Sequence, residues 1–171
     1  MKTMWAPWRM EYILSEKDGG CVLCGAVSNH DGLTLFKNKK TMVVMNKFPY
    51  TNGHLLVAPL RHVSELAELT REEMGDLMAI VERSVGVLKQ VTKPEGFNVG
   101  LNLGKVAGAG IESHLHFHIV PRWTGDVNAL AVLSDVRVVS EHLQTTYQNL
   151  KPYFEKIDVT ARNQESTNEE I

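Results

Sequence analysis

The chain has 171 residues, of which 43% are hydrophobic and 22% are charged, and its formal net charge is −2. These values are typical of a water-soluble domain with a core of its own, and they do not indicate general affinity for nucleic acids. No apolar stretch reaches membrane-spanning length, and the N-terminus lacks the apolar core of a signal peptide. We therefore expect a cytoplasmic protein without a membrane partner.

Three strands are predicted in the first third of the chain. Residues 33–37 and 41–46 are apolar segments joined by a polar turn, which is typical of a hairpin. After a loop at 49–53, the apolar run 54–59 predicts the third strand.

A long helix follows, from about residue 71 to residue 90. Thr70 and Glu73 form a capping box at its start, and apolar residues that include Met74 and Met78 recur at helical spacing, so we expect these methionines in the core. Another strand is predicted at 97–103, and a second helix at about 140–154. This order predicts an α+β fold with a five-stranded antiparallel sheet, one long helix and a C-terminal helix.

Three histidines, His114, His116 and His118, alternate with apolar residues from 114 to 120. On a strand this spacing places the imidazoles on one face and the apolar side chains on the other. Imidazole exchanges protons near neutral pH, attacks phosphorus and binds metals. A solvated strand face is the alternative, but this spacing arises in only on the order of 1 percent of shuffled chains. The pattern therefore favours an active site or a metal site.

The two cysteines, Cys21 and Cys24, have C-x-x-C spacing. They are too few for a disulfide framework, which leaves a redox motif, half of a zinc site, or chance. A redox motif is typical of a βαβ setting, whereas this pair precedes the first predicted strand. Zinc requires two further ligands from elsewhere in the chain.

The segment 114–120 resembles the His-φ-His-φ-His-φ-φ motif (φ apolar) of the histidine triad (HIT) superfamily of nucleotidyl hydrolases and transferases. Further similarity includes Asn46, Gly53-His54, the segment 59–63 and the glycine-containing loop 102–110. The resemblance places a single HIT domain at 1–157, with the motif core at about 21–123. The polar composition of residues 158–171 predicts a disordered tail. It implies a homodimer in which the strands of both subunits form one sheet.

The residues around Trp5, Trp8 and Trp123 are similar to the branch that includes bacterial diadenosine tetraphosphate phosphorylases. The resemblance implies a nucleotide substrate, attack at the α-phosphate and a nucleotidyl-histidine intermediate. Water, phosphate and a sugar phosphate remain open as acceptors, and the branch favours phosphate, which would convert diadenosine tetraphosphate to ATP and ADP. The role of Trp5 and Trp8 stays open.

The resemblance also assigns roles to residues. His116 would be the nucleophile, and His118 would hydrogen-bond at the phosphate or the bridging oxygen, with His114 completing the triad. The expected substrate-binding residues are Asn46 at the ribose, His54 at the site floor, Asn102, Gly108, Gly110 and Ser113 at the phosphates, and Trp123 at a base. A turn-forming role is the alternative for Asn46, and a packing role for Trp123. Ile111-Glu112 departs from the family's Gln-Ser or Gln-Thr pair.

Some triad proteins, and the related galactose-1-phosphate uridylyltransferases, pair such cysteines with two histidines. The resemblance thus implies a structural zinc held by Cys21, Cys24, His62 and His114, in which His114 anchors the strand that presents His116. Two other functions remain open. The three histidines would hold a catalytic zinc in a metal-dependent hydrolase, or the chain would be a catalytically silent nucleotide-binding protein.

Overall fold

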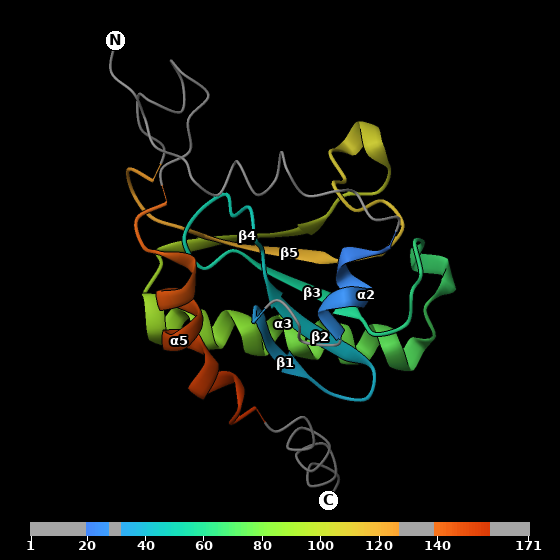
Figure 1. The fold of residues 1–171 in the computed structure, drawn as a ribbon, viewed down its shortest axis with the longest axis horizontal. Coiled ribbons are helices and arrows are strands. Elements are labelled where there is room, and N and C mark those ends of the chain that lie inside the picture. The colour runs from blue at the N-terminus through green and yellow to red at the C-terminus, as the bar shows by residue number, and fades with distance from the viewer. Residues whose placement is uncertain (1–19, 28–31, 127–138, 158–171) are drawn as a thin grey trace, which may run out of the picture.

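The computed structural model describes residues 20–27, 32–126 and 139–157. The expectations for Trp5, Trp8 and the tail at 158–171 lie outside these ranges. The described chain forms a five-stranded antiparallel sheet in the order β1-β2-β3-β5-β4 (Figure 1). Its strands are β1 (Thr34–Lys37), β2 (Thr41–Met45), β3 (Leu55–Pro59), β4 (Gly96–Leu101) and β5 (Phe117–Arg122).

The helices are α2 (Val22–Val27), α3 (Arg71–Thr92) and α5 (Leu143–Phe154), with short 3-10 turns η1 (Leu66–Glu68) and η2 (Lys105–Ala107). Helix α3 packs on β2, β3 and β5, and α5 packs against α3 and β1 (Figure 1). The predicted α+β fold is confirmed. None of the helices in the described ranges combines the length and apolar character that a membrane span requires.

The core lies between the sheet and helices α3 and α5. Every residue of β2 and β3 is buried, and Leu150 and Phe154 of α5 are inaccessible to solvent. On α3 the buried stripe includes Leu77, Ile80, Ser84 and Leu88. The expectation for Met78 is wrong, because its side chain is 46% exposed. The helix instead buries the side that carries Ile80 and Ser84. Because residues four apart lie on the same side of a helix, these two also form a continuous buried face.

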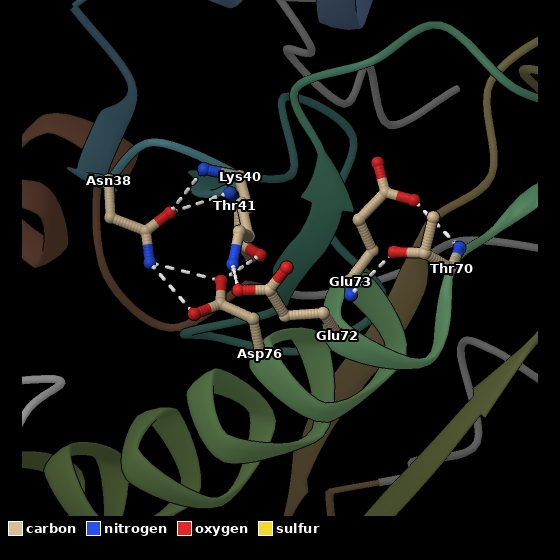
Figure 2. A network of polar contacts seen from close by, with 7 residues as sticks. All are labelled: Asn38, Lys40, Thr41, Thr70, Glu72, Glu73 and Asp76. Carbon is tan, nitrogen blue, oxygen red and sulfur yellow. Dashed lines mark hydrogen bonds and ion pairs between the residues drawn. The ribbon is translucent and has the colours of Figure 1, made fainter.

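Helix α3 begins at the predicted capping box. The Thr70 hydroxyl accepts a bond from the Glu73 backbone N–H, and the Glu73 carboxylate accepts one from the Thr70 N–H (Figure 2). The helix continues two residues beyond the expected Gln90 and ends at Thr92, and the next residue, Lys93, caps it with a left-handed φ of 47°. Helix α5 begins at Leu143 rather than at Ser140, with the His142 side chain accepting a bond from the Gln144 N–H.

A second polar cluster joins the β1–β2 turn to α3 (Figure 2). The Asn38 amide nitrogen and the Thr41 hydroxyl both donate to the Asp76 carboxylate, at 3.0 and 2.5 Å. The Asn38 side-chain oxygen accepts the backbone N–H groups of Lys40 and Thr41. We name Asn38, Thr41 and Asp76 the turn cluster.

Candidate active site and metal centre

The first two triad residues lie outside the strand. β5 begins at Phe117, so His114 and His116 precede it, and the expectation that all three imidazoles lie on one strand is wrong for both. The Leu115 backbone N–H donates to the Val63 carbonyl at 2.7 Å, which draws this segment against the residues that follow β3. His114 is thereby placed beside His62, with the two rings nearly perpendicular and 5.2 Å between centroids.

His114 and His62 complete a cluster with the two cysteines. Their candidate ligand atoms all lie within 4.8 Å of one another. His114 Nδ1 lies 3.3 Å from Cys21 Sγ and 3.5 Å from Cys24 Sγ, and His62 Nδ1 lies 3.2 Å from Cys24 Sγ. Tetrahedral zinc with usual bond lengths places sulfur and nitrogen ligands about 3.5 Å apart. The cluster therefore has the composition and spacing of a metal site.

The protonation of these ligands also fits a metal. His114 Nε2 lies 2.8 Å from the Pro59 carbonyl, which only accepts, so the neutral ring has its proton on Nε2 and a lone pair on Nδ1. Burial, and the nearby Cys21, raise the pKa of the Cys24 thiol. Two adjacent thiolates are thus disfavoured unless a cation neutralises them.

His116 is anchored by backbone. Its side chain is buried, and Nδ1 lies 2.7 Å from the carbonyl oxygen of His114. Since a carbonyl only accepts, Nδ1 donates, and the neutral ring has its lone pair on Nε2. This is the tautomer that a nucleophilic histidine requires.

His118 lies next to His116, with ring centroids 4.8 Å apart. Its Nδ1 lies 2.9 Å from Nε2 of His54, which is fully buried. Burial, and then the neighbouring His116, lower the pKa of His118 from 6.5 to about 4, so this imidazole is neutral at pH 7. Among the described residues, His118 Nε2 is the one buried side-chain nitrogen or oxygen atom that has no hydrogen-bond partner.

Gly53 allows His54 to reach this position. Its φ is 72°, and a Cβ atom there would lie 3.2 Å from Leu88 Cδ2 and 3.6 Å from Pro121 Cγ. A side chain would therefore be strained by the backbone and crowded by the core.

The Asn46 side chain is half-buried and makes local hydrogen bonds. Its side-chain oxygen accepts the Phe48 N–H at 2.9 Å, which is an Asx turn, and its amide nitrogen lies 3.3 Å from His54 Nδ1. These contacts favour the turn-forming alternative, and the ribose role stays a prediction. Tyr50, which the sequence analysis did not single out, donates its backbone N–H to the same His54 nitrogen at 3.1 Å.

The expected phosphate loop lies between β4 and the triad. The Asn102 amide donates to the Gly108 carbonyl at 3.3 Å, and Gly104 and Gly108 have φ values of 81° and 89°. Gly110 and Ser113 are the other two residues expected at the phosphates. Both are exposed and lie shortly before His114 in the sequence. The loop is closed on itself by Asn102 and presents exposed backbone next to the triad in sequence.

Trp123 follows β5 and does not join the histidine contacts. It lines a separate pocket of about 540 Å³ with Thr51, Asn52, Glu141 and Thr146 among its neighbours. None of the triad histidines lines that pocket. The base-stacking role of Trp123 therefore stays a prediction.

Comparison with known proteins agrees with this arrangement. The HIT domain family model matches residues 28–125. The chain belongs to the HIT family. It is 38% identical over 157 residues to the AP-4-A phosphorylase of Mycobacterium tuberculosis, with 85% of this chain and 80% of that protein covered. It is also 29% identical over 127 residues to the bis(5'-adenosyl)-triphosphatase of Dictyostelium discoideum, with 71% and 85% covered.

A solved structure of a histidine triad family protein supports the fold. The Zn-bound histidine triad family protein of Mycobacterium smegmatis aligns with a TM-score of 0.65 at 25% identity, covering 80% of this chain and 94% of that one. The predicted family is confirmed. The prediction of a HIT enzyme agrees with both named relatives, which are enzymes.

Proposed function

We propose that this HIT protein is a nucleotidyltransferase that cleaves dinucleoside polyphosphates at the α-phosphate through a nucleotidyl-histidine intermediate. The observation that carries the proposal is the bond between His116 Nδ1 and the His114 carbonyl. It leaves the Nε2 lone pair for attack, and no base is needed to remove a proton first. A bond forms between Nε2 and the α-phosphorus, and the bond from phosphorus to the bridging oxygen breaks with its electron pair on the leaving nucleotide.

Charge builds on the phosphate oxygens during this step, so preorganised donors favour it. His118 lies beside the nucleophile and is assigned this role, together with backbone N–H groups of the loop that contains Gly108 and Gly110. Asn102 closes the loop and Ser113 precedes the triad. Because Ile111-Glu112 replaces the family's usual pair, the contacts in this loop are expected to set substrate choice.

We assign inorganic phosphate as the acceptor in the second step. The similarity to the AP-4-A phosphorylase over 85% of this chain supports it. With diadenosine tetraphosphate the first step releases ATP, and attack of phosphate on the adenylyl-histidine releases ADP. Water in place of phosphate would give AMP, which is the outcome that a hydrolase predicts.

The test is incubation of the purified protein with diadenosine tetraphosphate, with and without inorganic phosphate, followed by chromatography of the products. We expect ATP and ADP, with turnover dependent on phosphate. ATP and AMP at the same rate in both conditions would contradict the phosphorylase assignment. Mass spectrometry of the intact chain and of its peptides, after acid-free quenching in the absence of phosphate, is expected to show an added adenylyl group on His116.

We propose a structural zinc at Cys21, Cys24, His62 and His114. When bound, zinc supplies a cross-link between α2, the segment after β3 and the triad. His114 would hold the metal through its side chain and the His116 ring through its carbonyl oxygen. The metal thereby supports the orientation of the nucleophile without contact to the substrate.

The contacts disfavour a catalytic zinc on the three histidines. His114 Nδ1 faces the cysteines, His116 Nδ1 bonds to backbone, and His118 Nδ1 bonds to His54. Elemental analysis is expected to give one zinc per chain, and Cys24→Ser is expected to reduce zinc content and melting temperature together. A protein that is folded and active with no bound metal would contradict the site.

A homodimer is proposed at strand β4. This strand lies at the edge of the sheet, and Val99 is 45% exposed on it. An edge strand has backbone groups that can pair with a second chain, which would give one continuous sheet. Light scattering is expected to give twice the chain mass of 19.1 kDa. Pro in place of Val99 is expected to shift the protein toward the monomer.

A further inference from the structure

A chain of hydrogen bonds leads from the loop after β2 to the last triad histidine. The Tyr50 backbone N–H lies 3.1 Å from His54 Nδ1. A backbone N–H only donates, so this ring nitrogen must accept. The Asn46 amide nitrogen lies 3.3 Å from the same atom, and its orientation is fixed because the Asn46 oxygen accepts the Phe48 N–H. Two independent donors therefore keep His54 Nδ1 unprotonated.

The remaining ring nitrogen of His54 carries the proton when the ring is neutral. His54 Nε2 lies 2.9 Å from His118 Nδ1, so it donates and His118 Nδ1 accepts. We propose that Tyr50 and His54 fix His118 as its Nε2–H tautomer, so that His118 presents a proton to a substrate oxygen. Tyr50 and His54 are then positioning residues. The proposal rests on the proposed function for the identity of that oxygen.

The surroundings of His118 fit a reserved donor. His118 Nε2 is buried and has no partner among the described residues. A buried donor without a partner is unfavourable, so such a group is retained where a ligand supplies the acceptor. The low pKa of His118, about 4, keeps the ring neutral, which is the state in which the tautomer is defined.

The Tyr50 side chain acts on the same pair of rings. Its ring lies 4.7 Å from the His54 ring, and it stacks on the His118 ring at 6.0 Å with an interplanar angle of 22°. One residue thus supplies the donor that sets the tautomer and a ring that covers both imidazoles.

The two adjacent histidines therefore have opposite tautomers. The His114 carbonyl accepts the proton of His116 and leaves a lone pair on Nε2, whereas His54 donates to His118 and leaves a proton on Nε2. In the adenylylation step the His116 lone pair forms the bond to phosphorus. The His118 N–H donates a hydrogen bond to a phosphate oxygen and keeps its proton throughout the step.

The test is two-bond ¹H–¹⁵N correlation NMR of the full chain with ¹⁵N-labelled histidine at pH 7.5. This experiment distinguishes the two neutral tautomers of each ring, and single His→Gln variants assign the signals. We expect His54 and His118 as Nε2–H and His116 as Nδ1–H. An Nδ1–H pattern for His118 in the wild type overturns the inference, whatever the variants do.

Two substitutions at His54 test the mechanism of the effect. His54→Leu removes the donor, and His118 is expected to populate both tautomers, with kcat reduced about 100-fold and KM little changed. His54→Gln retains an amide N–H that can reach His118 and is expected to restore the Nε2–H pattern and most of kcat. His142→Gln, at the residue that precedes α5, is the matched control and leaves the His118 signals unchanged.

These readouts separate the inference from the proposed function, since the tautomer is measured without turnover. His118 as Nε2–H in a protein that does not cleave dinucleoside polyphosphates would contradict only the function. His118 as Nδ1–H in an active phosphorylase would contradict only the inference. If His54→Leu does not fold, the wild-type spectrum decides alone.

Discussion

The turn cluster and the triad are both networks of polar side chains at the sheet, but they differ in how complete they are. In the turn cluster the Asp76 carboxylate accepts from Asn38 and Thr41, and the Asn38 oxygen accepts two backbone N–H groups (Figure 2). In the triad, His118 Nε2 is buried and has no hydrogen-bond partner within the described part of the chain. A complete network stabilises the fold, whereas an incomplete one gives up stability for an interaction with a ligand. Substitutions in the two networks should therefore separate activity from stability.

The largest effect is expected at the nucleophile. His116→Ala should lower turnover of diadenosine tetraphosphate at least about 1000-fold, because the covalent intermediate no longer forms. The free energy of unfolding should change by only about 1 kcal/mol, since one hydrogen bond to backbone is lost. Product formation and urea unfolding measure the two quantities. Turnover at the wild-type rate would rule out every mechanism through this histidine.

The reverse result is expected in the turn cluster. Asp76→Ala leaves the Asn38 amide and the buried Thr41 hydroxyl without their acceptor and should lower the free energy of unfolding by about 2 kcal/mol. The kcat of the folded protein should stay unchanged. Asp76→Asn retains one acceptor oxygen and should lose less. Equal stability of all three proteins would show that the cluster contributes nothing to folding.

Several features of the fold and of the site could be predicted from the sequence. The start of α3 at Thr70 and Glu73 follows from a spacing that has a direct physical cause. The succession of strands and helices predicted the antiparallel sheet, whereas the cysteine–histidine set was implied by the family resemblance. The position of Met78 could not, because two apolar stripes on α3 compete and only packing decides between them.

The departures at the site have physical causes that sequence patterns do not contain. His114 follows strand alternation in the sequence, yet the Leu115–Val63 hydrogen bond draws it to His62 and away from β5. Tyr50 acts through its backbone N–H, and a backbone donor has no side-chain signature. The tautomer of His118 depends on such a donor, so it became visible only in the structure.

The pH dependence of stability should reveal the free-energy cost of protonating the buried His118. The pKa of His118 is about 4 in the folded protein and 6.5 as the ordinary value, so between these values the unfolded chain binds the additional proton. The contribution of neutral His118 to the free energy of unfolding is therefore complete above pH 6.5 and is lost as the pH falls toward 4. Comparing His118→Gln with the wild type at pH 7 and pH 5, we expect the stability loss on acidification to be smaller in the variant by about 1–2 kcal/mol. The metal ligands are common to both proteins and cancel, so identical losses would contradict a depressed pKa.

The smallest effect is expected at the start of α3, where the polar contacts are partly exposed. Thr70→Ala removes the acceptor for the Glu73 N–H and should cost about 1 kcal/mol of stability. Glu73→Gln keeps an acceptor for the Thr70 N–H but loses the charge opposite Arg61, whose side chain is 49% exposed, so it should cost less than Thr70→Ala. Neither residue contacts the triad histidines, so both variants should turn over substrate at the wild-type rate. Urea unfolding measures the stability of both variants. A larger loss of stability for Glu73→Gln than for Thr70→Ala would mean that the ion pair with Arg61, which precedes His62 in the chain, stabilises this end of the helix more than the cap does.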